Sequence, residues 1–156
     1  MILNRRGEYS ILGMLHLAKQ QNGNFMGISE VAEAVSVPEK FLRILFHELV
    51  KSHMLRSQRG TGGGFSLARP ATEITLRQIV EAIQGPIAAF SCVTDQTTDC
   101  EKASCCGLHM VLQGIRRQVV QELDRYTLSD LATLTSGDGT VVPLAHIENG
   151  TETSPA

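Results

Sequence analysis

The sequence predicts a mainly helical fold with one small β-hairpin, in which a winged helix-turn-helix domain is followed by a long helix for dimerisation. Three observations predict this fold. Two short amphipathic segments are separated by a tight turn and followed directly by a glycine-rich hairpin pattern. The second of these segments has a basic face opposite its apolar face. Residues 107–125 carry apolar positions at a spacing close to that of a coiled coil.

Charge is divided unevenly along the chain. Residues 1–70 contain nine Lys and Arg against five Asp and Glu, whereas residues 71–156 contain five against eleven. The positive N-terminal half can attract the phosphates of nucleic acid, and the acidic remainder keeps the protein in solution. The apolar runs are too short to span a membrane and the start lacks the apolar core of a signal peptide, so we expect a cytoplasmic protein.

Apolar residues at helical spacing predict the first three helices. The first helix covers 5–21 and ends at an Asn-Gly-Asn turn. Ser29 is the expected N-cap of the short second helix. The third helix spans about 38–52, and Ser36 and Glu39 have the spacing of a capping box at its start.

The exposed face of the third helix is basic. Lys40, Arg43 and His47 are spaced i, i+3, i+7, which places them on one side of the helix. Such a face is typical of a recognition helix in the major groove, where Lys and Arg can donate to guanine edges. An ordinary solvated helix face has the same pattern, so the residues that follow decide between the two interpretations.

Those residues predict the wing of a winged helix. Two short alternating segments, 55–59 and 65–68, flank a glycine-rich tip that contains Gly60 and Thr61. Glycines allow the tip to lie close to a phosphate backbone, and Arg59 can enter the narrow minor groove. A nucleotide-binding P-loop is excluded, because no lysine stands at the required position.

The second half of the chain begins with another helix. Thr75 and Gln78 have the spacing of a capping box, and the apolar stripe behind them ends at Gly85 and Pro86. A cysteine-rich loop follows, and then the long helix over 107–125. Its seam, which we expect to pair with a second copy of the chain or to pack back on the core, consists of Leu108, Leu112, Ile115, Val119 and Leu123.

Four regions result from these patterns. A winged helix-turn-helix DNA-binding domain (1–85) is followed by the cysteine-rich loop (86–106), by the dimerisation helix with a short end helix (107–134), and by a tail (135–156). The tail is rich in Gly, Thr, Ser, Pro and Glu, which predicts disorder.

All four cysteines lie in one short segment. They are Cys92, Cys100, Cys105 and Cys106, and His109 comes three residues after the last of them. Two disulfides would use all four, but structural disulfides rarely persist in a reducing cytosol, where metal or redox roles prevail. The segment is therefore a candidate site for a metallocofactor.

Several motifs occur together in the order of a known family. They are Arg6-Gly7-x-Tyr9, Phe41-Leu42, Arg59-Gly60-x-Gly62-Gly63-Gly64-Phe65, and the cysteine cluster before the long helix. Over about residues 1–134 the chain resembles the IscR/NsrR family of winged-helix regulators. The resemblance implies a homodimer that binds pseudopalindromic promoter DNA, with contacts from Lys40, Phe41, Arg43, His47, Arg59, Gly60 and Thr61. It also implies an iron–sulfur cluster, [2Fe–2S] in preference to [4Fe–4S], that responds to iron–sulfur supply, nitric oxide, oxygen or redox state.

By this resemblance Cys92, Cys100 and Cys106 match the three cluster cysteines, and His109 matches the fourth ligand of IscR-like members. Thiolates are the standard iron–sulfur ligands, and histidine can replace one of them. Cys106 and His109 would face the same way at a helix start, whose positive end favours a thiolate. Zinc would also accept such ligands, but the spacings lack the paired C-x₂₋₄-C of structural zinc sites.

Departures from the family pattern leave alternatives open. The first cysteine spacing is two residues longer than the family commonly has. Cys105 could replace Cys106 as the ligand or act as a spare thiol. Glu8 stands where some NsrR-like members place a carboxylate ligand from the other subunit, so it competes with His109 for the fourth position. Alternatively, Glu8 is only an acidic residue at the start of a helix, where a negative charge is favourable.

The alternative function is a cluster-free thiol switch on the same fold, in which Cys105 or Cys106 is oxidised to a sulfenate or a disulfide. An enzyme is not expected, because the sequence has no C-x-x-C in a βαβ context, no legible Ser–His–Asp arrangement and no Walker lysine. An interaction module that does not bind DNA would not need the basic face of the third helix.

Overall fold

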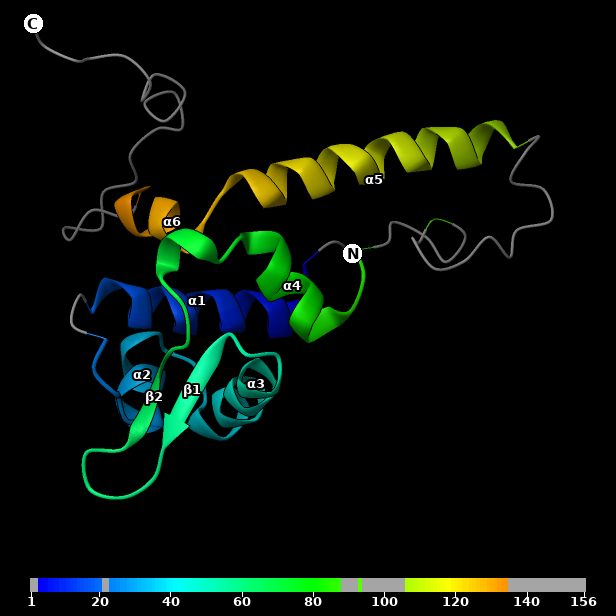
Figure 1. Cartoon of the computed structure of the whole chain (residues 1–156). Coiled ribbons are helices and arrows are strands. Elements are labelled where there is room, and N and C mark those ends of the chain that lie inside the picture. The colour runs from blue at the N-terminus through cyan, green and yellow to red at the C-terminus, as the bar shows by residue number, and fades with distance from the viewer. Residues whose placement is uncertain (1–2, 21–22, 88–92, 94–105, 135–156) are drawn as a thin grey trace, which may run out of the picture.

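The computed structural model describes residues 3–20, 23–87, 93 and 106–134 (Figure 1). Within these residues the protein is mainly helical with one β-hairpin, which confirms the predicted fold class. The elements are α1 (Arg5–Lys19), α2 (Ile28–Ala34), α3 (Glu39–Lys51), β1 (Leu55–Gln58), β2 (Gly64–Leu67), the 3₁₀ turn η1 (Ala71–Glu73), α4 (Leu76–Gln84), α5 (Gly107–Arg125) and α6 (Leu128–Leu134). The tail 135–156 and most of the cysteine segment lie outside the described residues.

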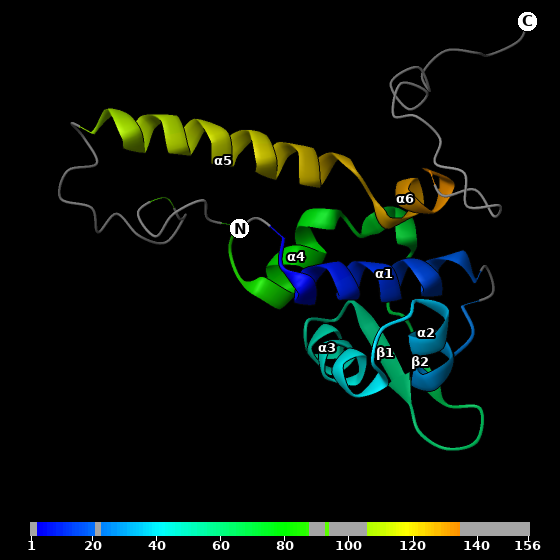
Figure 2. The same cartoon turned by 180° about the vertical axis from the view of Figure 1, so that it is seen from behind.

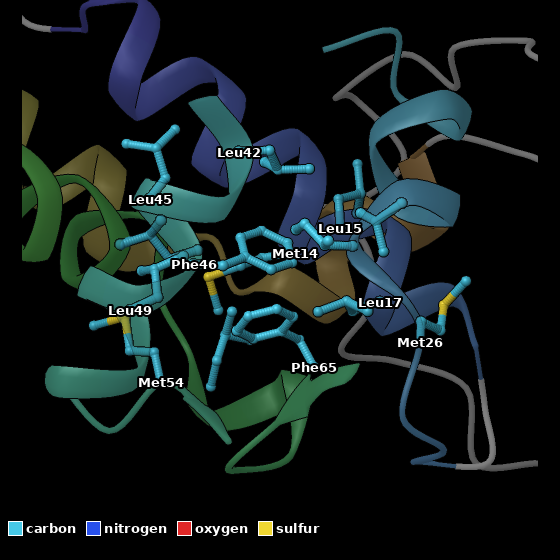
Figure 3. Packing of buried hydrophobic residues seen from close by; sticks show 14 of the residues in the cluster. Met14, Leu15, Leu17, Met26, Leu42, Leu45, Phe46, Leu49, Met54 and Phe65 are labelled. Carbon is cyan, nitrogen blue, oxygen red and sulfur yellow. The ribbon is translucent and has the colours of Figure 1, made fainter. Parts of the chain in front are cut away.

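Helix α1 is the centre of the fold. One side of it faces α2, α3 and the hairpin, and the other faces α4 and α6 (Figures 1 and 2). Met14 of α1, Phe46 of α3 and Ile79 of α4 are completely buried in one hydrophobic cluster. Figure 3 shows Phe46 and Phe65 packed beside Met14. The core therefore joins the hairpin to the helices on both sides of α1.

A glycine lets α1 approach α3 closely. A Cβ atom added to Gly13 would lie 2.7 Å from the ring of Phe46, which is closer than a real methyl group can come. Gly7, near the start of α1, allows a close approach to α4, since an added Cβ would lie 2.5 Å from the side-chain oxygen of Gln84. Both glycines fix the distance between α1 and its neighbours.

The N-terminal caps of α2 and α3 differ from the predicted ones. Gly27, not Ser29, is the N-cap of α2, and the Ser29 hydroxyl donates a 2.7 Å hydrogen bond to the carboxylate of Glu39. The predicted capping box at α3 is also wrong: Pro38 is the N-cap and no side chain caps the helix. Ser36 adopts a left-handed conformation (φ 54°) in the turn, before the cap position. The Glu39 carboxylate is therefore free to join α3 to α2.

The predicted hairpin is present: β1 ends one residue earlier than expected, and β2 has the expected four residues but begins and ends one residue earlier. Strands β1 and β2 are antiparallel, with Leu55 opposite Leu67 and Gln58 opposite Gly64. Met26 adds a single bridge to β2, and its backbone exchanges hydrogen bonds of 3.0 and 2.9 Å with Phe65. This bridge joins the segment before α2 to the wing.

The C-terminal part returns to the body of the molecule. Helix α4 has the predicted capping box of Thr75, and α5 then runs beyond α4, in roughly the same direction as α1 (Figures 1 and 2). The backbone N–H of Leu128 donates to the carbonyl of Ile74 at 2.9 Å, and the Leu128 side chain is completely buried in the core. Helix α6 is thus packed on the winged-helix core rather than separate from it. None of the described helices is long and apolar enough to cross a membrane.

Candidate nucleic-acid interface and metal centre

The outward face of α3 carries the three residues that the sequence predicted. Lys40, Arg43 and His47 are all exposed, and Lys51 continues their stripe one turn further on. Their exposure follows from helical spacing, because the core-facing positions of α3 are apolar and buried. Ile44, which is also exposed on this face, was missed by sequence reasoning because its residue type is typical of a core.

The Arg43 side chain is held by Glu39 of the same helix, and Glu39 is in turn hydrogen-bonded to α2. The Arg43 guanidinium forms an ion pair with Glu39, one turn earlier. The hydroxyl of Ser29 and the guanidinium of Arg43 hold the pKa of the Glu39 carboxyl below its ordinary value. A carboxylate that accepts hydrogen bonds from both helices fixes the angle between α2 and α3.

His47 and Phe41 have different environments on α3. The His47 ring lies edge-to-face on Phe65 of β2, with ring centroids 5.6 Å apart, and so connects the helix to the wing. The Phe41 ring is half-buried and packs edge-to-face against Tyr9 of α1 at 5.8 Å. Phe41 thus stabilises the contact between α1 and α3, and its ring does not project from the basic face.

The tip of the wing stands clear of the body. Arg59, Gly60 and Thr61 are exposed, and nothing lies within 4 Å of a Cβ atom added to Gly60. Gly60 and Gly62 both have positive φ (94° and 76°), a conformation that other residues adopt only with strain. The tip is therefore a protruding turn whose arginine is free to reach a groove.

A series of polar contacts joins the end of α4 to α3. The side-chain oxygen of Gln84, the last residue of α4, accepts a 2.8 Å hydrogen bond from the backbone of Asn4, and Asn4 caps α1. Arg6, in the first turn of α1, donates to both carboxylate oxygens of Glu48 on α3, at 2.7 and 2.6 Å. No sequence signal indicated these contacts, because they join residues more than 40 positions apart.

The described part of the cysteine segment lies at the start of α5. Cys106 is the N-cap residue of that helix and has a half-buried free thiol. His109, in the first turn, is half-buried, and its Nδ1 atom is inaccessible to solvent without a hydrogen-bond partner among the described residues. Cys92, Cys100 and Cys105 lie outside the described residues.

These features fit a metal ligand set. A buried imidazole nitrogen without a partner is unfavourable by about 1–3 kcal/mol, which a bond to a metal would offset. Cys106 stands at a helix N-terminus, and the thiolate is the form of cysteine that ligates iron. Among the described residues no three candidate ligands come together. The start of α5 supplies two candidate donors, Cys106 and His109. Glu8, the competing ligand, is exposed in the first turn of α1.

The predicted seam of α5 is split between two environments. Leu112 is buried within its own chain, whereas Leu108 and Ile115 are exposed. Val111, which the sequence reasoning missed, is 58% exposed one turn from both of them, and Met110 is 73% exposed on a different face of the helix. The remaining two seam residues, Val119 and Leu123, are half-buried. The first half of α5 thus presents an apolar surface that is unusual for a monomer.

Polar contacts attach α5 to α4. Arg77 of α4 pairs with Asp124 near the end of α5 at 2.8 Å, and this carboxylate raises the pKa of the guanidinium above its ordinary value. Thr75 donates to the same carboxylate at 3.2 Å. Nearer the start of α5, Arg116 donates to the backbone carbonyl of Ile87 at 2.7 Å. The residues that lead into the cysteine segment are therefore joined to α5.

Comparison with known proteins identifies the family. The sequence profile of the Rrf2 family, described as iron-dependent transcriptional regulators, matches residues 3–134. The chain belongs to the Rrf2 family. Because its relatives are transcriptional regulators, this chain is a DNA-binding transcription regulator and not an enzyme. The predicted resemblance to IscR and NsrR is confirmed.

Several relatives are similar over most of the chain. The chain is 31% identical to protein aau3 of Rhizobium meliloti over 132 residues (84% of each chain) and 27% identical to NsrR of Oceanobacillus iheyensis over 131 residues (84% and 89%). It is 26% identical to IscR of Vibrio parahaemolyticus over 133 residues (85% and 78%).

Two solved structures of CymR are also similar. CymR of B. subtilis, described as its global cysteine regulator, has a TM-score of 0.72 and 27% identity, and covers 87% of this chain and 99% of its own. The oxidised form of CymR from Staphylococcus aureus has a TM-score of 0.66 and 26% identity (85% and 96%). A protein described as a global cysteine regulator is thus similar to this chain, whose family is described as iron-dependent.

Proposed function

We propose that this protein is a cytoplasmic, homodimeric regulator whose affinity for promoter DNA is set by an iron–sulfur cluster. The cluster is held by Cys92, Cys100, Cys106 and His109, with [2Fe–2S] favoured over [4Fe–4S]. The observation that carries this proposal is the buried Nδ1 atom of His109, which lies one turn from the Cys106 thiol and has no hydrogen-bond partner within the part of the chain that the structure describes. Glu8 and Cys105 remain the competing ligands.

The DNA is bound by α3 and the wing. The basic stripe of Lys40, Arg43 and His47 enters the major groove, while Arg59 at the wing enters the adjacent minor groove. Support for this geometry comes from the ring contact between His47 and Phe65, which fixes the wing against the helix. Gly60 and Thr61 let the tip lie close to the phosphates.

Two copies of α5 form the dimer. Leu108, Val111 and Ile115 form an exposed apolar stripe on α5, which a second copy would cover. A two-fold dimer presents two recognition helices, so the DNA site is pseudopalindromic.

The cluster supplies redox and ligand-exchange chemistry when it is bound, and the chain's own residues pass on its state. The segment that carries the cysteines begins beyond Gln84, whose side chain holds the cap of α1 through Asn4. Arg6, two residues further on, is paired with Glu48 of α3. A displacement of the end of α4 would therefore be transmitted to α3 through these few contacts.

The experiment is anaerobic purification followed by an absorption spectrum and assays of iron and sulfide. We expect a coloured protein whose visible bands are lost in Cys106→Ala, while Cys105→Ala, an adjacent matched control, keeps them. His109→Ala and Glu8→Ala then decide the fourth ligand: the variant of the true ligand shifts the spectrum. A colourless protein without iron or sulfide would refute the cluster.

A thiol switch is the second candidate, because Cys106 has a free, half-buried thiol at a helix N-terminus and an oxidised form of CymR is among the similar structures. In that case a metal-free protein would lose or gain DNA affinity after treatment with peroxide. Cys106→Ser or Cys105→Ser would abolish the response, and a thiol reductant would reverse it.

A further inference from the structure

We propose that Ile44 recognises the C5-methyl group of a thymine in the major groove, which adds a specificity contact to the proposed DNA-binding function on which it rests. Ile44 lies in the middle of α3 and is 52% exposed. Single exposed apolar residues are common and indicate nothing by themselves. What distinguishes Ile44 is its position on the face that α3 presents to DNA.

Helical spacing places Ile44 among the basic residues of that face. Lys40 precedes it by four residues and His47 follows it by three, so both are its neighbours on the helix surface. The side of α3 that faces the core is already filled by four buried apolar residues. Ile44 therefore contributes nothing to the core and points where the basic side chains point.

The polar neighbours of Ile44 are held by other contacts. Arg43 is paired with Glu39, which also accepts from Ser29, and the His47 ring rests against Phe65. Ile44 follows Arg43 and lies one turn before His47, and its own side chain is left to meet whatever occupies the face. Its β-branched side chain has one strongly preferred rotamer in a helix, so it loses little freedom when it packs on a target.

The chemistry of the major groove selects the target. The base edges there present hydrogen-bond donors and acceptors, and thymine adds the only methyl group of the four bases. An isoleucine opposite a cytosine amino group or a guanine oxygen would leave that polar group without a partner. Opposite thymine it buries a methyl group instead, so the contact favours thymine at one position of each half-site.

The test replaces single thymines by deoxyuridine, which lacks only the methyl group. DNA that the full-length protein binds is first selected from a randomised duplex pool, and each thymine is then exchanged in turn. We expect one position in each half-site at which the exchange weakens binding by about fourfold, the effect of removing one buried methyl group. In Ile44→Ala that effect disappears, whereas Ile44→Val and the control Leu12→Ala, an exposed leucine on α1, keep it.

A second substitution tests the same contact in the opposite direction. At the position identified in this way, 5-methylcytosine should bind more tightly than cytosine in the wild type and equally well in Ile44→Ala. The inference is overturned if the selected DNA binds but no exchange depends on residue 44. It is also overturned if Ile44→Ala leaves DNA affinity unchanged and alters the sedimentation of the protein, because the residue then contacts protein. If the pool yields no bound sequence at all, the proposed function itself fails.

Discussion

Substitution of Gly64 by alanine would break the link between the wing and the segment before α2. Gly64 has a φ of 150°, and a Cβ atom at this position would lie 2.0 Å from the carbonyl oxygen of Met26. That oxygen accepts a hydrogen bond from Phe65, and a second hydrogen bond runs in the opposite direction. The backbone cannot keep both bonds and admit the methyl group, so the bridge must open.

The expected loss of stability has two parts. A non-glycine residue in a sparsely populated backbone region is unfavourable by about 1–3 kcal/mol. Each backbone hydrogen bond of the bridge contributes about 1 kcal/mol net, so their loss adds about 2 kcal/mol. We therefore expect Gly64→Ala to lower the free energy of unfolding by about 3–5 kcal/mol.

Gly62→Ala is the matched control, because Gly62 also has a positive φ but nothing lies within 4 Å of an added Cβ. It should lower the free energy of unfolding by about 1 kcal/mol, from backbone strain alone. Urea denaturation followed by circular dichroism gives both values. Equal losses in the two variants would refute the bridge between Met26 and Phe65 as the cause.

Three further predictions concern polar contacts. A double-mutant cycle on Arg6→Ala and Glu48→Ala should give a coupling energy of about 0.5–1 kcal/mol that falls with salt, because the ion pair is partly exposed; zero coupling in urea denaturation at low salt would contradict it. The lowered pKa of Glu39 stabilises the fold above the ordinary carboxyl pKa, and this contribution is lost as the pH falls through the lowered value. Ser29→Ala should therefore weaken the pH dependence of unfolding in the acid range, and an unchanged pH profile would contradict the hydrogen bond. Thr75→Ala removes the side-chain cap of α4. It should lower the free energy of unfolding by about 1 kcal/mol and therefore lower the melting temperature; a melting temperature equal to that of the wild type would contradict the cap.

Patterns of local spacing were enough to predict the helices and the wing. The apolar positions of α3 repeat with helical period, so the exposed placement of Lys40, Arg43 and His47 follows from the sequence. The capping box of Thr75 was predicted for the same reason, because all of its partners lie within one turn. Interactions confined to neighbouring residues can be read in this way.

Contacts between distant segments could not be predicted. Glu39 has the correct spacing to Ser36 for a capping box, yet it binds Ser29 instead, because the turn between the helices places Ser36 in a left-handed conformation. The coiled-coil spacing of α5 did not reveal that Leu112 packs inside its own chain. Both outcomes depend on tertiary packing, which a local pattern does not record.

The burial of the Nδ1 atom of His109 is likewise a property of the fold. The sequence placed a histidine three residues after Cys106, but a spacing does not show whether a side chain is buried. The structure adds that Nδ1 is shielded from solvent. This is a physical reason for a ligand role that is separate from the family resemblance.

Control of DNA binding by the cluster is tested most directly by one titration. The dissociation constant of the selected duplex is measured anaerobically for the protein as purified and for the same protein after the iron has been removed with a chelator, both with the thiols reduced. We predict that the two constants differ by tenfold or more, and that Cys106→Ala gives the value of the iron-free protein. Equal constants for the iron-loaded and iron-free forms would contradict control by a cluster.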